Sequence, residues 1–153
     1  MQQSSHEMEQ SCSAIYSVMQ SLIDSQQALV EVGEKLEDQN LKQFLLTESL
    51  KRAEFRAELE SILNREGVGN LLESGTEPGH VQRALADLRL RSHEAGFHAL
   101  ISAAEESEFA ACEAYTRAIN AFPPTPILRL LASQASHIQQ THEFVKAASR
   151  RAA

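Results

Sequence analysis

Hydrophobic side chains recur every three or four positions along four long segments of the chain, which is the spacing of one face of an α-helix. The clearest case is a run of apolar residues at intervals of seven: Ile15, Leu22, Leu29 and Leu36. Two prolines, Pro123 and Pro124, end the third segment. Thr125 followed by Pro126 is typical of a helix start. The pattern predicts four helices, at about residues 11–38, 40–65, 92–122 and 125–150.

The connections between these helices differ in length, and this difference predicts the topology. Only a few residues separate the helices of the first pair and of the last pair, so each pair should form an antiparallel hairpin. Residues 66–79 are rich in Gly, and the apolar spacing of residues 80–91 predicts a short extra helix. A long crossover between two hairpins makes the second and third helices parallel. We therefore expect an all-α, ferritin-like four-helix bundle over residues 11–151, with a crossover helix and a flexible N-terminus at residues 1–10.

Charge and composition narrow the classes of function. The 153-residue chain has a formal charge of -7, whereas a phosphate-binding surface needs concentrated basic residues, so we expect no nucleic-acid partner. No apolar run approaches the roughly 20 residues of a membrane span, and the N-terminus lacks the features of a signal peptide. We expect a cytoplasmic protein with no membrane partner. Cys12 and Cys112 lie in no metal-binding spacing and are expected to be reduced packing residues, with a redox role for Cys112 as the alternative.

Several polar residues interrupt the predicted apolar faces at similar heights along the bundle. Glu108 shares a stripe with Tyr115, and His142 interrupts the stripe of the last helix. Counting about 1.5 Å per residue from each turn places Arg52 and Gln26 level with Glu108. A buried carboxylate needs a partner, and the permanently charged Arg52 is the natural one for Glu108. The predicted buried polar layer comprises Gln26, Arg52, Glu108, His142 and Tyr115.

The alternative for this layer is a divergent metal site that uses iron or manganese. Its candidate ligands are Glu48, Glu105, Glu108 and His142. A di-iron site in a ferritin-like bundle takes a Glu from each of two helices and a Glu-x-x-His pair from each of the other two. The four predicted long helices contain no Glu-x-x-His pair, and the second helix offers Arg52, which cannot ligate a metal. We therefore expect no cofactor.

The second helix carries a further apolar stripe on nearly the opposite side from its core-facing residues. This stripe comprises Leu46, Leu50, Ala53 and Ala57. An apolar face that the bundle itself does not cover is typical of an interface with another molecule. We predict a homodimer that forms through this stripe.

Three stretches of the chain resemble a known family: SLIDSQQALVEVGEKLED, ESGTEPGHVQRALADL and AAEESEFAACEAYTRAI. They are similar to the ferritin-like bacterial four-helix-bundle proteins called domain of unknown function 2383. The resemblance spans about residues 16–149, and its most specific parts are residues 75–83 and the pattern of Glu105, Glu108 and Tyr115. It implies the ferritin-like fold and brings no established activity.

These patterns together predict a non-catalytic binding, structural or stress-related module, in which a buried polar layer replaces a di-iron site. The alternative is a divergent di-metal carboxylate protein with oxidase or metal-binding activity. The spacing identifies no nucleophile with an adjacent base, so an enzyme is the less favoured interpretation.

Overall fold

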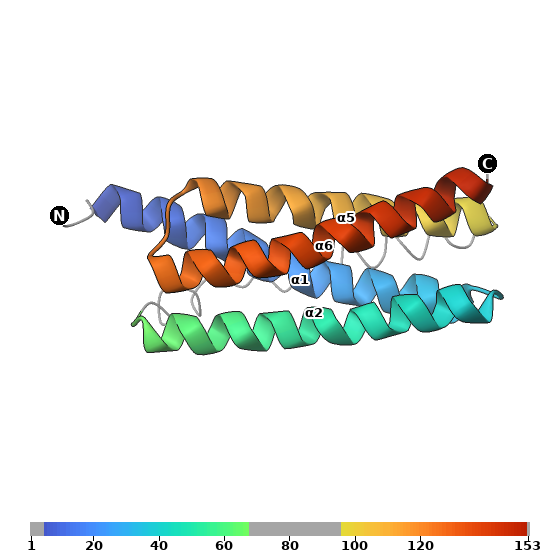
Figure 1. Ribbon diagram of the computed structural model, residues 1–153, viewed down its shortest axis with the longest axis horizontal. Helices are drawn as coiled ribbons and strands as arrows, with labels where there is room; N and C mark the ends of the chain where they lie inside the picture. The colour runs from blue at the N-terminus through green and yellow to red at the C-terminus, as the bar shows by residue number, and fades with distance from the viewer. Residues whose placement is uncertain (1–4, 68–95, 153) are drawn as a thin grey trace.

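The computed structural model of the protein is an all-α bundle of four long helices (Figure 1). It describes residues 5–67 and 96–152. The helices are α1 (Ser5–Lys35), α2 (Gln39–Arg65), α5 (Phe97–Asn120) and α6 (Thr125–Ala152). The four long helices predicted from the apolar spacing are confirmed, although α1 begins before the predicted residue 11. The extra helix predicted at residues 80–91 lies outside the described residues.

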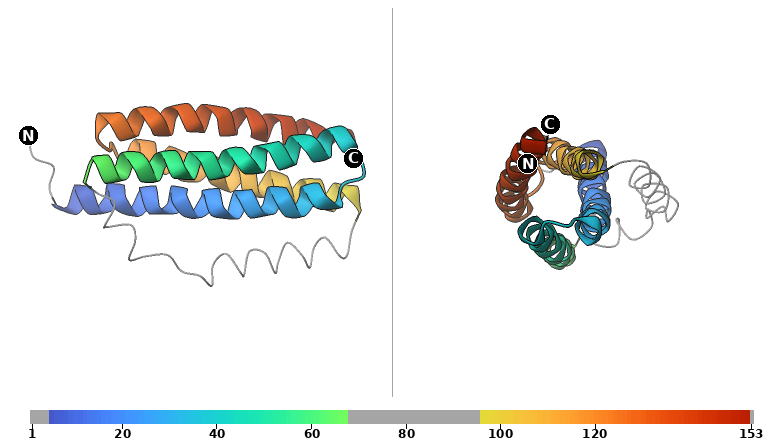
Figure 2. Two further views of the ribbon diagram at one scale, coloured as in Figure 1. Left: turned by 90° about the horizontal axis from the view of Figure 1, so that it is seen from below. Right: turned by 90° about the vertical axis from the view of Figure 1, so that its right-hand side faces the viewer.

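Neighbouring helices run antiparallel, and α2 and α5 run in the same direction (Figure 1). Seen along its axis, the bundle has one helix at each of four corners, with α2 diagonally opposite α5 (Figure 2). α1 packs extensively on α2 and α5, and α5 packs extensively on α6, whereas α2 and α6 meet less closely. Two hairpins joined by a long connection give this arrangement of helix directions.

Specific contacts fix the two hairpins. The Asp38 side chain caps α2 by accepting a hydrogen bond from the backbone N–H of Leu41 at 3.1 Å. At Gly33 the two helices of the first hairpin approach closely, because a Cβ atom there would lie 3.0 Å from Leu46 Cδ2. At the other end, Ser11 Oγ donates to the carbonyl oxygen of Ala121 at 3.0 Å and ties α1 to the α5–α6 turn.

The apolar core consists of two clusters that follow one another along the bundle. The cluster nearer the α5–α6 turn includes Leu22, Leu59, Ala111 and Ile138. The cluster nearer the α1–α2 turn includes Leu29, Leu45, Ala104 and Val145. Between them each helix presents a buried polar residue: Ser25, Arg52, Glu108 and Thr141. The packing of the two clusters therefore places these polar residues at one height. Within the described residues, no helix carries an apolar stretch long enough to cross a membrane.

Candidate functional site

Arg52 lies at the centre of the polar region, and its side chain has no exposed surface. The pattern of α2 explains this position, because the buried Leu45 and Leu59 lie seven residues before and after Arg52 on the same helix face. Arg52 Nη2 donates to Glu108 Oε2 at 2.7 Å, and Nη1 donates to Glu48 Oε2 at 3.3 Å. One guanidinium therefore joins two buried carboxylates, one from α2 and one from α5.

Ser25 is the member of this network that α1 supplies, and it is fully buried. Its hydroxyl accepts a hydrogen bond from Arg52 Nε at 3.2 Å and donates one to Glu108 Oε1 at 2.9 Å. Glu108 consequently has a donor on each of its two oxygens. Because an unpaired buried charge is costly, these contacts offset the desolvation of both Glu108 and Arg52.

Glu48 connects the network to α6. Its Oε2 accepts a hydrogen bond from Thr141 Oγ1 at 3.1 Å and lies 2.8 Å from His137 Nε2. Because a carboxylate only accepts, the imidazole of His137 donates through Nε2. The His137 side chain is 29% exposed, so the network of Arg52, Glu108, Glu48, Ser25, Thr141 and His137 meets solvent at this edge.

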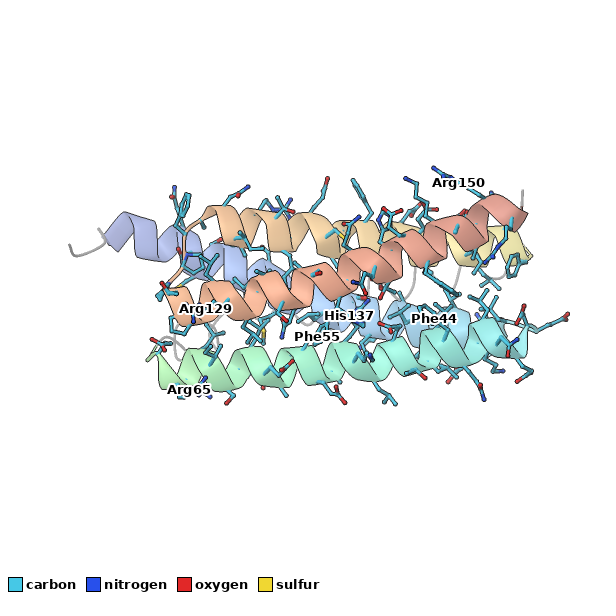
Figure 3. All side chains as sticks on the ribbon, in the orientation of Figure 1. Phe44, Phe55, Arg65, Arg129, His137 and Arg150 are labelled. Atoms are coloured by element: carbon cyan, nitrogen blue, oxygen red, sulfur yellow. The ribbon has the colours of Figure 1, made fainter. Side chains whose placement is uncertain are left out.

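Aromatic rings flank the network where α2 meets α6. Figure 3 shows Phe44, Phe55 and His137 between these two helices. The rings of Phe55 and His137 meet edge to face with centroids 5.4 Å apart, and the guanidinium carbon of Arg52 lies 5.9 Å from the Phe55 centroid. Phe44 and Phe144 stack with centroids 4.0 Å apart. These rings supply apolar contact area between α2 and α6 on either side of the hydrogen-bonded groups.

Two residues predicted for the polar layer lie outside this network. Gln26 is partly exposed, because successive residues are about 100° apart around a helix and Ser25 takes the inward position. His142 is buried against Phe109 of α5, with ring centroids 6.0 Å apart. The histidine that contacts a carboxylate of the network is His137, which lies on the side of α6 that faces α2.

Tyr115 contributes to a separate polar contact within the core cluster nearer the α5–α6 turn. Its hydroxyl donates to Gln134 Oε1 at 2.7 Å, and Gln134 Nε2 donates to the carbonyl oxygen of Phe55 at 3.1 Å and to Glu58 Oε1 at 3.3 Å. Burial raises the pKa of Tyr115 well above its usual range, so its phenol stays protonated and serves as a donor. Tyr115 therefore lies in the polar interior, but its partner is Gln134 rather than Glu108.

The four candidate metal ligands are not gathered in one place. Glu48 and Glu108 bind different nitrogens of the Arg52 guanidinium, which is a permanent cation and has no free electron pair for a metal. Glu105 is partly exposed, and His142 faces Phe109. Across residues 5–67 and 96–152, no three His, Cys, Asp or Glu side chains come together as a possible metal site.

The helices and this interior define the chain as an all-α four-helix-bundle protein with a buried ion-pair network. Its residues 10–121 match the model of the family described as "Domain of unknown function (DUF2383)", and the chain belongs to that family. The family resemblance predicted from the sequence is thereby confirmed, and the family carries no assigned function. No curated protein and no solved structure matched the chain.

Cys112 is a half-buried thiol on α5, and its reactivity is predictable from its surroundings. Burial, with a smaller contribution from the Glu108 carboxylate, raises the pKa of the Cys112 thiol to about 11. Because the thiolate is the reactive form, we expect slow alkylation of Cys112 by iodoacetamide at neutral pH and a rate that rises toward pH 11. Mass spectrometry of the digested protein measures the rate, with the urea-unfolded chain as the control. Fast alkylation in the folded chain at neutral pH would contradict this expectation.

Proposed function

We propose that this chain is a non-catalytic, ferritin-like binding or structural module, with an internal ion-pair network where metal-binding relatives of that architecture hold their metals. The observation that carries the proposal is the complete burial of Arg52 between Glu48 and Glu108. A guanidinium in this position supplies a fixed positive charge from the chain itself. It meets the carboxylates that would otherwise require a bound cation.

Helix directions support the ferritin-like part of the proposal. α2 and α5 run in the same direction, and residues 66–96 connect them from one end of the bundle to the other. Ferritin-like bundles have one such long crossover, whereas simple up-and-down bundles have short loops throughout. Carboxylate proteins with this topology place their metal ligands on the inward faces of all four helices, and each helix of this chain likewise has a buried polar residue in the network.

The chemistry of the network supports the non-catalytic part. The guanidinium remains charged throughout the physiological pH range, so Arg52 cannot exchange a proton with a substrate. Both oxygens of Glu108 and Oε2 of Glu48 already accept hydrogen bonds within the chain. An acid or base that acts on a substrate has to offer an oxygen within reach of that substrate, and the fully buried Glu108 does not.

A structural role accounts for the network more directly. Each of the four helices contributes at least one of its groups, and sliding any helix by one turn would separate a charge from its partner. Buried ion pairs are weak sources of net stability, because desolvation cancels much of their attraction, but they can penalise wrong helix registers. We therefore propose that the network fixes the register of the four helices. Any binding would then use the outer surface of the bundle.

Metal analysis tests this proposal. We expect protein purified without chelator to contain iron, manganese and zinc at well below one equivalent per chain. We also expect added Mn²⁺ or Zn²⁺ to leave the melting temperature unchanged, because only an ion that binds the folded state raises it. Elemental analysis by mass spectrometry and thermal unfolding followed by circular dichroism are the two measurements.

Two matched variants locate any metal that is found. Glu108→Gln alters the buried carboxylate, and Glu113→Gln alters an exposed carboxylate on the same helix, whose side chain is 54% exposed. A stoichiometric metal that disappears in Glu108→Gln and persists in Glu113→Gln would overturn the proposal. It would establish the metalloprotein alternative instead.

A further inference from the structure

The apolar stripe of Leu46, Leu50, Ala53 and Ala57 runs along α2 from its contact with α1, where Leu46 lies against Gly33, to the outward side of the helix. Leu50 is 65% exposed, Ala57 is exposed, and Leu46 and Ala53 are partly buried. Leu50 points away from the bundle, because it lies two residues before the fully buried Arg52 and residues two apart face nearly opposite sides of a helix. Leu50 and Ala57 thus give this side of α2 an exposed apolar surface, and the arrangement of the whole stripe decides whether a partner fits it.

The order of the residues along the stripe shows which partner fits. They are spaced by four, three and four positions, which is the spacing of a coiled-coil seam. Both leucines lie in the N-terminal half of α2, and both alanines lie in the C-terminal half. The side chains of the stripe are therefore large at its N-terminal end and small at its C-terminal end. Two copies of the stripe that run in opposite directions place large side chains against small ones.

We propose that α2 pairs antiparallel with α2 of a second copy of this chain about a two-fold axis near residues 51 and 52. In this register Leu50 lies opposite Ala53 of the second copy, and Leu46 lies opposite Ala57 of the second copy. Each of these pairs then joins one leucine with one alanine, so the distance between the two helices stays the same along the interface. The surface is isologous, so one stripe serves both subunits.

Charges beside the stripe follow the same symmetry. Lys42 lies beside the N-terminal end of the stripe, and Glu60 lies beside its C-terminal end on the same flank. Lys42 donates a 3.4 Å hydrogen bond to the carbonyl oxygen of Glu34, and Glu60 makes a 3.8 Å contact with Arg56. Antiparallel pairing brings Lys42 of each copy next to Glu60 of the other, which gives two equivalent ion pairs.

Parallel pairing of the same two faces fits less well. Its two-fold axis would run along the helices and put this flank of one copy on the opposite side of the seam from the same flank of the other, so neither Lys42–Glu60 ion pair would form. It would also put leucine against leucine at one end and alanine against alanine at the other, so the helices would diverge. Shape and charge thus select the antiparallel dimer. This inference does not rest on the proposed function, because Leu50 and Ala57 point away from Arg52 and the stripe supplies no group to the buried network.

Sedimentation of the full chain tests the dimer. We expect the wild-type protein to sediment as a dimer at micromolar concentration and Leu50→Glu to sediment as a monomer with unchanged helix content. Ala132→Glu places the same charge at an exposed position of α6 and should leave the dimer intact. A wild-type monomer, or a dimer that survives Leu50→Glu, would overturn the proposal whatever the metal analysis shows.

A charge exchange tests the orientation. Lys42→Glu alone and Glu60→Lys alone should each weaken the dimer by about tenfold in Kd, because each converts two attractive contacts into repulsive ones. The double variant Lys42→Glu with Glu60→Lys restores opposite charges across the interface and should return Kd close to the wild-type value. Failure of the double variant to recover would rule out the antiparallel register.

Discussion

Replacement of Arg52 by methionine is expected to lower the free energy of unfolding by about 3–5 kcal/mol, the usual loss when one partner of a buried ion pair is removed. Methionine keeps an unbranched apolar chain at the position but removes every N–H donor. Glu108 then retains only the hydroxyl of Ser25 as a donor, and Glu48 retains its contacts with α6. The fully buried Glu108 carries most of the expected loss, because the variant removes its ion pair with Arg52 and leaves its charge in the interior.

Urea unfolding followed by circular dichroism measures this loss for Arg52→Met. The matched control is Arg129→Met, which removes an exposed arginine from α6 and should change stability by at most about 0.5 kcal/mol. A free energy of unfolding for Arg52→Met within about 1 kcal/mol of the wild-type value would contradict this prediction. It would mean that Glu108 is not held in a dry interior with Arg52.

The helices were predictable because their apolar faces are long and regular. Leu22, Leu29 and Leu36 keep the same spacing through α1, and the prolines after Phe122 end α5. The N-terminal boundary of α1 was less predictable. Residues 5–10 are mostly polar, so they lack the apolar period from which a helix is recognised, yet the helix continues through them.

The central ion pair was also predictable, because Arg52 and Glu108 each fall on an inward line defined by buried neighbours. The choice between Ser25 and Gln26 was a question of angle. Ser25 lies seven residues after Val18 and seven before Val32, which are both fully buried, whereas Gln26 is rotated from that line by about 100°. Counting residues from the turn gives the height of a residue but not its direction, so it did not separate Gln26 from Ser25, whose hydroxyl both accepts and donates in the network.

The residues that α6 contributes to the network could not be predicted from the apolar spacing of α6 alone. Thr141 and His142 flank the same inward line on opposite sides, so periodicity places both near the core. Which flank meets Glu48 depends on which neighbour, α2 or α5, lies on each side of α6. That is a property of the assembled bundle, and it also explains why the partly exposed His137 reaches a carboxylate.

Simultaneous replacement of the three charged groups is expected to recover the stability that Arg52→Met loses. In the variant Arg52→Met, Glu48→Gln, Glu108→Leu, no charge is stranded, and glutamine still offers an oxygen to Thr141 and His137. Exchange of a buried ion pair for apolar residues of similar volume is often neutral or stabilising by about 1–4 kcal/mol. We therefore expect this triple variant to be at least as stable as the wild type in the same urea experiment.

The matched control for the triple variant combines Arg52→Met with Glu106→Gln and Glu113→Gln, which remove two exposed carboxylates and should restore nothing. If the triple variant stays as unstable as Arg52→Met, the loss comes from packing of the arginine side chain rather than from a stranded carboxylate. If stability returns, the register role predicts a further change. Apolar contacts alone do not distinguish neighbouring helix heights, so the triple variant should bind more of the hydrophobic dye ANS and exchange its amide hydrogens faster than the wild type.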